Sequence, residues 1–550
     1  MKITLLVSTF NSLSQLVYTY LCERGDIVDV VYANSASRDE EIESFSPEII
    51  LSPYLRDYIP KSIYENYPTY IFHPGPLGDR GAYSLENALG KKEWGVVILK
   101  ANALFDGGDI YVQKNFEVRN TYKASLYRNE VLSSYASVLD LFFENVIANK
   151  KEQQDVSLAL NKDPNYQIDW DNDTTEEIVK KVYTYDSFPG IEDEILGLKV
   201  RLYGAWKEER LRGNFPKEIV AKRDGAICLS TIDGAIWITH LKEETKFKLP
   251  ATYVLKDRLK GVKEERLPLI FDKSYKTFYE ISCNIKDEIA YLHFNFHNGA
   301  FSSDKCMKLK YAFEYIKTEA KVVVLMGGQD FFSNGIHLNL LEDSKKNGED
   351  GWSNINAMND LVKSILFADD VVTVASLHKN AGAGGVFLAL ACDYVIADEI
   401  VILNPHYKTL GLSGSEYHTY TLPKRVREEK AQELLDACLP IGAKEAERIG
   451  MVDKVFSHAD YMDNLQRFCK KIVSNEDQCG DFLWEKEDYL EENKQLIEQA
   501  RENEIAVMHS EFWDKESNFH KLRYEFVYKV CPLVTPKRLK IAAKKGREDA

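Results

Sequence analysis

Residues 381–398 read AGAGGVFLALACDYVIAD, a cluster of glycines followed by an apolar run and a short strand-like segment. Similar apolar segments occur at 289–294, 321–326 and 371–376, and glycines cluster between them. Short apolar runs bounded by turn residues are typical of buried strands. The pattern therefore predicts an α/β domain over residues 278–456.

The first part of the chain shows a comparable alternation of apolar runs and amphipathic segments. Such alternation predicts a parallel α/β sheet of the Rossmann-like class over residues 1–155. The expected strands of this domain are 3–7, 27–32, 49–51, 70–72 and 95–100.

A polar stretch at 161–173 interrupts that pattern and predicts a change of domain. A helical segment at 176–185 and short strands at 199–205, 226–230 and 235–240 follow it, and this spacing predicts a small, OB-like β-barrel over 156–255. The basic, proline-containing residues within 256–277 are expected to form a linker. The charged residues 457–550 are expected to form a helical C-terminal extension with a basic tail.

Composition sets limits on the class of protein. At about 150 residues per domain, 550 residues predict about three or four domains. The net charge of -16 argues against binding to nucleic acid. Nine scattered cysteines, never spaced C-x-x-C, make a metal site or a disulfide framework improbable. Because no apolar run reaches 18 residues and no signal peptide is recognisable, we expect a cytoplasmic protein without a membrane span.

Two polar side chains are expected at the carboxyl ends of strands in the first domain. His73 lies in FHPGPLGDRG (72–81), and Asp106 lies in LFDGGDI (104–110). Ligands of α/β sheets bind at such strand ends, and a His beside a carboxylate can transfer protons and stabilise an oxyanion. From spacing alone, a hairpin turn at Asp106 and an ordinary loop residue at His73 explain the pattern equally well.

Both motifs resemble those of the formyltetrahydrofolate-dependent formyltransferases. LSPYLRDYIP (51–60) is similar to the pterin-binding loop of that family, and the segment from YQIDW to STIDGAIWI (166–238) is similar to its C-terminal barrel. The resemblance implies formyltetrahydrofolate as the one-carbon donor, with His73 polarising the formyl group and Asp106 transferring the amine proton. One position departs from the family, because Ile71 stands where the family has an asparagine oxyanion donor.

The later region resembles the crotonase, or enoyl-CoA hydratase and isomerase, superfamily. The resemblance rests on GGQDFFSNGIHL (327–338) and on AGAGGVFLALACDYVIAD (381–398). It implies an oxyanion hole made by the backbone amides of Ile336 and Gly384, where glycine lets the backbone approach a thioester oxygen of a coenzyme A (CoA) substrate. The alternative is a pair of glycine-rich structural turns.

The acid–base carboxylates of hydratases are absent from their expected positions. Phe387 occupies one position, and the second falls in LNPHY (403–407), where no carboxylate stands. Simple addition of water to a double bond is therefore disfavoured. Glu416 and Tyr417, in GLSGSEYHTY (411–420), are candidate replacements, and Tyr407 with Glu416 is the preferred pair. A buried carboxyl has a raised pKa, although either tyrosine alone could equally be a core residue.

The order of the two enzyme-like halves resembles that of the HypX family of hydrogenase maturation factors. This resemblance implies formyl transfer to CoA, followed by conversion of formyl-CoA into carbon monoxide and CoA for NiFe hydrogenase assembly, with hydrogenase maturation proteins as candidate partners. The alternatives are a bifunctional formyltransferase or hydrolase with an independent hydratase or isomerase domain, and a non-catalytic maturation scaffold. The acidic charge disfavours tRNA formylation.

A protein of net charge -16 must hold the phosphates of CoA in a local basic pocket. The candidate CoA-binding residues are Gln15, Arg128, Ser187 and Arg538. A charged C-terminal run is, however, more often only a solvated surface.

Overall fold

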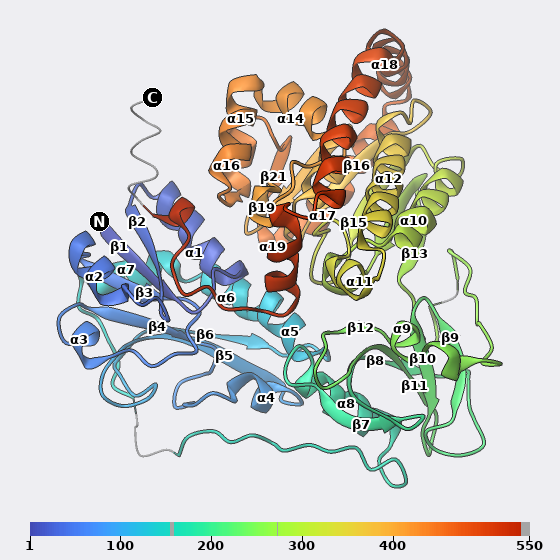
Figure 1. The fold of residues 1–550 in the computed structure, drawn as a ribbon. Coiled ribbons are helices and arrows are strands. Elements are labelled where there is room, and N and C mark those ends of the chain that lie inside the picture. The colour runs from blue at the N-terminus through green and yellow to red at the C-terminus, as the bar shows by residue number, and fades with distance from the viewer. Residues whose placement is uncertain (155–158, 272, 541–550) are drawn as a thin grey trace. The chain divides into compact units, whose positions relative to one another are not determined.

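The computed structural model describes residues 1–154, 159–271 and 273–540. Within these residues the chain forms two compact units (Figure 1). The first unit contains 1–266, 273–278 and the C-terminal segment from Cys531, and the second contains 267–271 and 279–530. No helix in the described ranges is long and apolar enough to cross a membrane.

The first unit opens with a six-stranded sheet in the order β2-β1-β3-β4-β5-β6. The first four strands in that order are parallel, as the sequence predicts, but β5 and β6 are antiparallel, so the sheet is mixed. β5 runs antiparallel to both of its neighbours, β4 and β6. The return from β5 to β6 is a tight loop, in which a Cβ at Gly108 would lie 1.6 Å from the Lys100 carbonyl oxygen, so the close approach requires glycine. The strands are β1 (Lys2–Val7), β2 (Ile27–Tyr32), β3 (Ile49–Ser52), β4 (Thr69–His73), β5 (Glu93–Lys100) and β6 (Ile110–Glu117).

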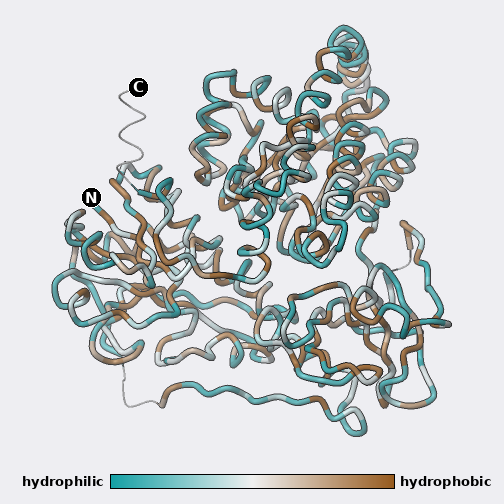
Figure 2. The backbone as a smooth tube through the Cα atoms, viewed as in Figure 1, coloured by the Kyte–Doolittle hydropathy of each residue, from teal (hydrophilic) through white to brown (hydrophobic). Residues whose placement is uncertain are grey.

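Helices pack against this sheet, and Figure 2 shows hydrophobic residues concentrated in its central strands. Asn11 caps the first helix by accepting a hydrogen bond from the Ser14 amide. The helices are α1 (Ser12–Glu23), α2 (Arg38–Phe45), α3 (Lys61–Tyr64), α4 (Ser84–Ala88), α5 (Lys123–Leu126), the π-helical turn η1 (Tyr127–Val131), α6 (Leu132–Ala136) and α7 (Leu139–Ile147).

An antiparallel sheet in the order β7-β8-β11-β10-β9, with β12 paired to β11, forms the second part of this unit. It follows α8, which begins with a capping box between Thr174 and Glu177. Residues 263–265, within the expected linker, hydrogen-bond to Lys222 of β9. The elements are α8 (Thr175–Tyr185), β7 (Ile191–Ile195), β8 (Leu198–Glu208), β9 (Ile219–Arg223), β10 (Ala226–Ser230), β11 (Ala235–Lys242), β12 (Leu249–Pro250), α9 (Ala251–Leu255) and η2 (Lys256–Leu259).

The second unit is built on a sheet in the order β13-β14-β15-β16-β18-β21, in which only the β13–β14 pair is antiparallel among the described pairs. A small three-stranded sheet carries the glycine cluster. The strands are β13 (Ile281–Lys286), β14 (Ile289–Phe294), β15 (Val322–Gly327), β16 (Val372–Leu377), β17 (Ala381–Gly382), β18 (Tyr394–Asp398), β19 (Ile402–Asn404), β20 (Ile441–Gly442) and β21 (Lys454–Phe456).

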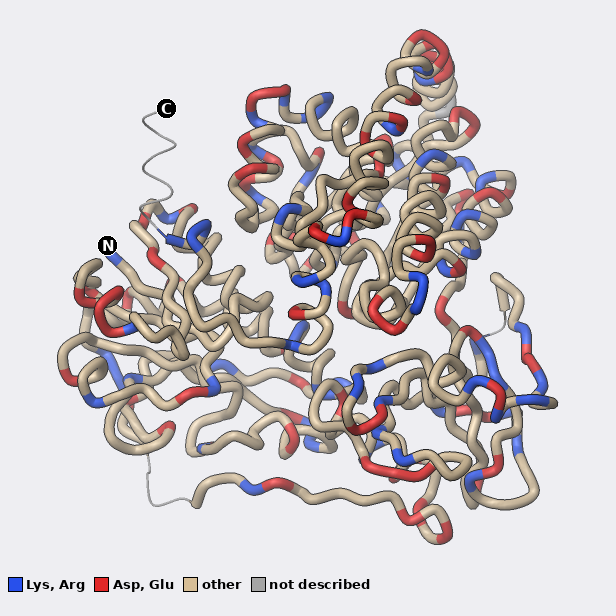
Figure 3. The backbone as a smooth tube through the Cα atoms, viewed as in Figure 1, with Lys and Arg blue, Asp and Glu red and all other residues tan. Residues whose placement is uncertain are grey.

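Helices cover this sheet, and the long helix α18 runs beside α12 and α14 (Figure 1). Acidic residues are frequent on α15 (Figure 3), in keeping with the negative net charge. The helices are η3 (His297–Gly299), α10 (Ser303–Ile316), α11 (Leu338–Asp343), α12 (Asn347–Leu366), α13 (Gly384–Leu390), η4 (Lys408–Leu410), α14 (His418–Val426), α15 (Glu428–Ala437), α16 (Ala443–Arg448), η5 (His458–Asp460), α17 (Tyr461–Ser474), α18 (Glu476–Trp513) and α19 (Asn518–Val527).

The C-terminal segment returns to the first sheet, where it includes η6 (Lys537–Leu539). The Tyr32 amide of β2 donates to the Thr535 hydroxyl at 2.9 Å. Lys540 forms ion pairs with Asp29 and Glu41. The end of the described chain is therefore tied to β2 and α2, while the rest of the expected basic tail, 541–550, lies outside the described residues.

Candidate functional site

His73 is the last residue of β4, and its side chain is only 4% exposed. Its Nε2 lies 2.8 Å from Oδ2 of Asp79, and its Nδ1 lies 3.5 Å from Oδ2 of Asp106. The structure therefore brings the two sequence-predicted residues together and adds a second carboxylate, that of Asp79. A Cβ at Gly75 would lie 2.1 Å from Asp79 Oδ2 and 2.5 Å from His73 Nε2, so this close approach requires glycine.

Asp106 lies in the loop between β5 and β6 and adopts a φ of 46°. Asp106 Oδ2 accepts a hydrogen bond from the Gly81 amide at 3.1 Å, and its backbone carbonyl accepts one from Gln154 Nε2 at 3.0 Å. Backbone strain of this kind is retained where surrounding contacts fix the conformation. These contacts hold the carboxylate against the loop that follows His73.

Sequence reasoning missed Asp79 and its partner Asn161. The Asn161 amide nitrogen donates to both oxygens of Asp79, at 3.2 and 3.3 Å, and its backbone amide donates to the Arg80 carbonyl at 2.7 Å. Burial raises the pKa of Asp79, but hydrogen bonds from His73, Ser84 and Asn161 outweigh it, so the pKa is lowered. The only local signal in the sequence was an acidic residue in the Gly-rich loop after His73.

Ile71, the position that departs from the formyltransferase pattern, lies on β4 between β3 and β5. Its side chain packs against apolar clusters that include Leu99 and Ile110. It therefore supplies no hydrogen bond to an oxyanion.

Two glycine-flanked loops of the second unit lie side by side. Ser333 bridges to Ala381, and a Cβ at Gly335 would lie 3.3 Å from the Gly384 nitrogen. Within the described residues, the amides of Ile336 and Gly384 donate to no protein acceptor. Gly384 also begins α13, where backbone N–H groups have no partner inside the helix. Two adjacent free amides can stabilise a thioester oxyanion.

Tyr407 and Glu416 form a buried pair, as the sequence predicts. The Tyr407 hydroxyl donates to Glu416 Oε2 at 2.5 Å and also lies 3.0 Å from the Ser415 carbonyl oxygen. A Cβ at Gly384 would lie 2.7 Å from the Glu416 carboxyl carbon. The carboxyl therefore lies directly against the start of α13, beside the free amides.

Burial sets the proton affinity of this pair. Glu416 is 1% exposed, and desolvation is the main cause that raises its pKa to about 7. Burial and the Glu416 charge raise the pKa of Tyr407 well above its usual value. Phe387, at the position of the missing hydratase glutamate, stacks on the Tyr407 ring with centroids 5.3 Å apart. Glu416 is thus a carboxyl that can both take and release a proton near neutral pH.

Tyr417 occupies a different environment from its neighbour Glu416. Its backbone has a φ of 58°, and its amide donates to Glu504 of α18 at 2.9 Å. Its ring is fully buried, burial raises its pKa to about 12, and the positive charge of Arg501 acts in the opposite direction. The described contacts pair Glu416 with Tyr407 rather than with Tyr417.

Comparison with known proteins identifies both halves of the chain. Residues 284–532 match the enoyl-CoA hydratase/isomerase family, and residues 162–258 match the formyl transferase C-terminal domain. The hydrogenase maturation factor HoxX of Bradyrhizobium diazoefficiens is 34% identical over 98% of this chain and 96% of its own length. The chain belongs to the HypX/HoxX family of hydrogenase maturation factors.

A solved HypX structure and a formyltransferase are also similar to this HypX-family chain. The crystal structure of HypX from Aquifex aeolicus in complex with tetrahydrofolic acid has a TM-score of 0.93 at 39% identity and covers 98% of both chains. A methionyl-tRNA formyltransferase of Pseudothermotoga lettingae is 27% identical over 41% of this chain and 78% of its own length. The HypX-family fold thus joins a formyltransferase-type unit to a crotonase-type unit.

The four candidate CoA-binding residues of this HypX-family chain lie in the first unit. Gln15, on α1, donates from Nε2 to the Phe10 carbonyl at 3.0 Å. Burial raises the pKa of Tyr18 on α1. The positive charge of Arg538, in η6, acts in the opposite direction. Arg128 lies in η1, and Ser187 follows α8 with a φ of 78°. The charge of Arg538 thus acts on a residue of the helix that carries Gln15.

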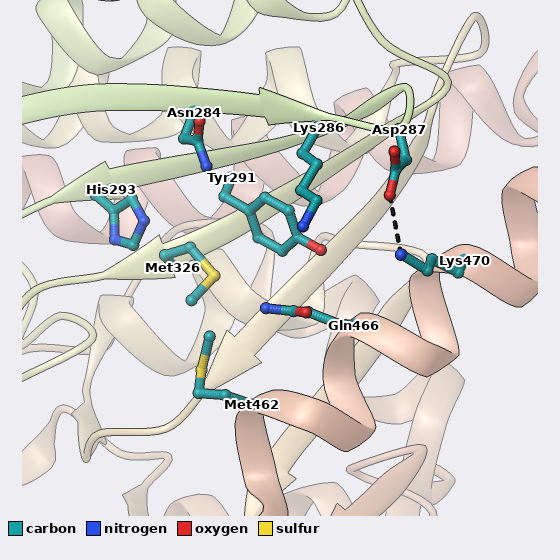
Figure 4. A pocket seen from close by; sticks show the side chains of 9 residues that line it. All are labelled: Asn284, Lys286, Asp287, Tyr291, His293, Met326, Met462, Gln466 and Lys470. Atoms are coloured by element: carbon teal, nitrogen blue, oxygen red, sulfur yellow. Dashed lines mark ion pairs between the residues drawn. The ribbon is translucent and has the colours of Figure 1, made fainter. Parts of the chain in front are cut away.

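The second unit of the HypX-family chain also contains a cavity of about 240 Å³. Figure 4 shows side chains from β13, β14, β15 and α17 around it, with an ion pair between Asp287 and Lys470 at 2.9 Å. None of its lining residues belongs to the His73 cluster or to the Tyr407–Glu416 pair. Its lining residues are Asn284, Lys286, Asp287, Tyr291, His293, Met326, Met462, Gln466 and Lys470.

Proposed function

We propose that this protein transfers a formyl group from formyltetrahydrofolate to CoA and then converts formyl-CoA into carbon monoxide and CoA. The carbon monoxide would supply the active-site ligand of a NiFe hydrogenase, with hydrogenase maturation proteins as recipients, in the cytoplasm. The Aquifex aeolicus relative in complex with tetrahydrofolic acid supports a folate substrate. The crotonase-type unit supports a CoA thioester.

The first step is assigned to His73 and Asp106. The CoA thiol loses its proton to His73, and its sulfur attacks the formyl carbon. The carbon–nitrogen bond then breaks, and the folate nitrogen takes a proton from the His73–Asp106 pair. One S–H and one C–N bond are exchanged for one C–S and one N–H bond, so no oxidant or reductant is needed. The separation of 3.5 Å between His73 Nδ1 and Asp106 Oδ2 is longer than a hydrogen bond, and catalytic contacts of this kind tighten when the substrate binds.

The second step is assigned to Tyr407 and Glu416. Formyl-CoA has no α-carbon, so enolate chemistry is impossible. Glu416 instead removes the formyl proton, the carbon–sulfur bond breaks, and the thiolate recovers a proton, which gives carbon monoxide and CoA. The amides of Ile336 and Gly384 would orient the thioester oxygen. The observation that carries this proposal is the buried Tyr407–Glu416 hydrogen bond at 2.5 Å beside those amides.

The alternative function is that of two independent enzymes. The first unit would then transfer the formyl group to another acceptor or hydrolyse the formyl donor, and the crotonase-type unit would act separately as a hydratase or isomerase. The burial of Phe387 at the expected glutamate position disfavours a hydratase. Dependence of folate turnover on CoA separates the two functions.

The decisive experiment incubates the purified protein with formyltetrahydrofolate and CoA in the presence of a haem reporter. We expect the spectrum of the carbon monoxide complex only when both substrates are present. Omission of CoA is the first control and His73→Ala is the second. Tetrahydrofolate release without carbon monoxide and without need for CoA would refute the coupled reaction in favour of the alternative function. A protein inactive with both substrates would instead favour a scaffold.

Arg538→Ala tests the CoA-binding assignment. Loss of one guanidinium that contacts a phosphate is expected to raise the apparent dissociation constant for CoA by about tenfold, because a charge-assisted hydrogen bond contributes about 1.5–3 kcal/mol. Isothermal titration with CoA measures this constant, and Arg467→Ala, an exposed arginine of α17, is the matched control. An unchanged constant would remove Arg538 from the binding site.

A further inference from the structure

Both ring nitrogens of His73 face carboxylates, but at different distances. The 2.8 Å contact from Nε2 to Asp79 is a normal hydrogen bond, whereas the 3.5 Å contact from Nδ1 to Asp106 is longer than one. Asp106 Oδ2 already accepts the Gly81 amide. The firm partner of the imidazole is therefore Asp79, a residue outside the two-residue catalytic assignment above.

The surroundings of Asp79 hold it in that place. Its amide donates to the Pro76 carbonyl at 2.9 Å, and Asn161 donates to both of its carboxylate oxygens. Two further groups near this cluster are Arg80, whose Nε donates to the Phe105 carbonyl, and Tyr135, whose pKa is raised by burial and also by the charge of Asp106. The lowered pKa of Asp79 agrees with an ionised side chain, which only accepts hydrogen bonds.

We propose that Asp79, braced by Asn161, is a positioning residue that keeps a proton on Nε2 of His73 and so leaves Nδ1 to exchange the reacting proton. A carboxylate that accepts from one nitrogen of an imidazole decides which nitrogen carries the proton. The inference rests on the proposed formyl transfer, for which it names the reacting nitrogen. Nδ1 takes the thiol proton beside Asp106 and later delivers it to the folate nitrogen. Asp79 itself neither gains nor loses a proton.

Asp79→Leu is the most informative change because it keeps the approximate size of the side chain but removes the acceptor. Asparagine is unsuitable, since Asn161 lies 3.2 and 3.3 Å from the two carboxylate oxygens and so favours neither orientation of an amide. In Asp79→Leu the carboxylate of Asp106, 3.5 Å from Nδ1, still faces the ring. Leucine should therefore move the proton from Nε2 to Nδ1.

The first readout is nitrogen NMR of the full-length protein labelled with ¹⁵N-histidine, without substrates. The chain has 11 histidines, and the His73 signals are assigned by their loss in His73→Gln. In the wild type, Nε2 should carry a proton. In Asp79→Leu it should not, while Asp140→Leu, the same change at an exposed position on α7, should leave the His73 signals unchanged. A proton on Nε2 in Asp79→Leu would overturn the proposal.

The second readout is the rate of tetrahydrofolate formation from formyltetrahydrofolate and CoA. We expect kcat to fall by about 10³-fold in Asp79→Leu, because a wrong tautomer costs up to about 10⁴-fold in a comparable His–Asp pair, with less than about a threefold change in KM. Asp79→Glu should retain more activity than Asp79→Leu, since glutamate keeps a carboxylate that can accept from Nε2. A merely structural role predicts that the larger glutamate is the worse of the two, and that result would overturn the proposal. An inactive wild type would refute the proposed function instead, and the NMR result would still test the role of Asp79.

Discussion

Glu416→Gln is expected to reduce carbon monoxide formation from supplied formyl-CoA by about 10³-fold and to leave formyl transfer unchanged. A positioned general base contributes about 10²–10⁴-fold to a rate. Glutamine keeps the shape of the side chain and an oxygen that can accept from Tyr407, but it cannot take a proton. The haem reporter measures carbon monoxide, and tetrahydrofolate release measures the first step.

Glu429→Gln, an exposed position on α15, is the matched control and should behave like the wild type. Tyr407→Phe should give a smaller loss, since it removes only the hydroxyl that orients Glu416. Full activity of Glu416→Gln would rule out Glu416 as the base.

The pH dependence of the same step gives an independent check. Burial raises the pKa of Glu416 to about 7, so the rate of carbon monoxide release should rise with pH and level off above about 7.

The raised pKa of Glu416 also affects stability. Between about pH 4.5 and 7 the folded protein keeps a proton on Glu416 that the unfolded chain releases. The contribution of this carboxyl to stability is therefore present below that range and is lost as the pH rises. Thermal unfolding at pH 8 should show Glu416→Gln at least as stable as the wild type.

His73→Gln is expected to lower carbon monoxide formation from formyltetrahydrofolate and CoA by about 10³-fold, through loss of proton transfer in the first step. Supplied formyl-CoA should restore carbon monoxide release to the wild-type rate, because Tyr407 and Glu416 are unaltered. His520→Gln, on α19, is the matched control. Failure of formyl-CoA to restore the rate would contradict the division of labour between the two sites.

Much of the architecture can be predicted from local sequence patterns. The strands with mainly apolar sequences, such as β2 and β14, lie where their hydrophobicity indicates. The antiparallel direction of β5 relative to β4 and β6 could not be predicted in this way, since it follows from the path of the connecting loops. Hydrophobic pattern identifies a strand, but it does not give its direction relative to its neighbours.

The same distinction applies to the candidate sites. Tyr407 and Glu416 are only nine residues apart, and the absence of hydratase carboxylates draws attention to them. Asp79 and Asn161 are 82 residues apart, so no local pattern reveals their contact. Tyr417 illustrates a further limit: at its positive φ the direction of a side chain does not follow from helical or strand periodicity.

The tie between residues 531–540 and β2 bears on the order in which the protein is made. The crotonase-type unit is an insertion in the sequence of the formyltransferase-type unit, because the latter resumes only at Cys531. Domains generally fold as they leave the ribosome, the N-terminal ones first. Here the ribosome must finish the whole insertion before the earlier unit receives its last segment, so a prematurely terminated chain would carry an incomplete first unit. Translation of the second enzyme-like half is thus a condition for completing the first.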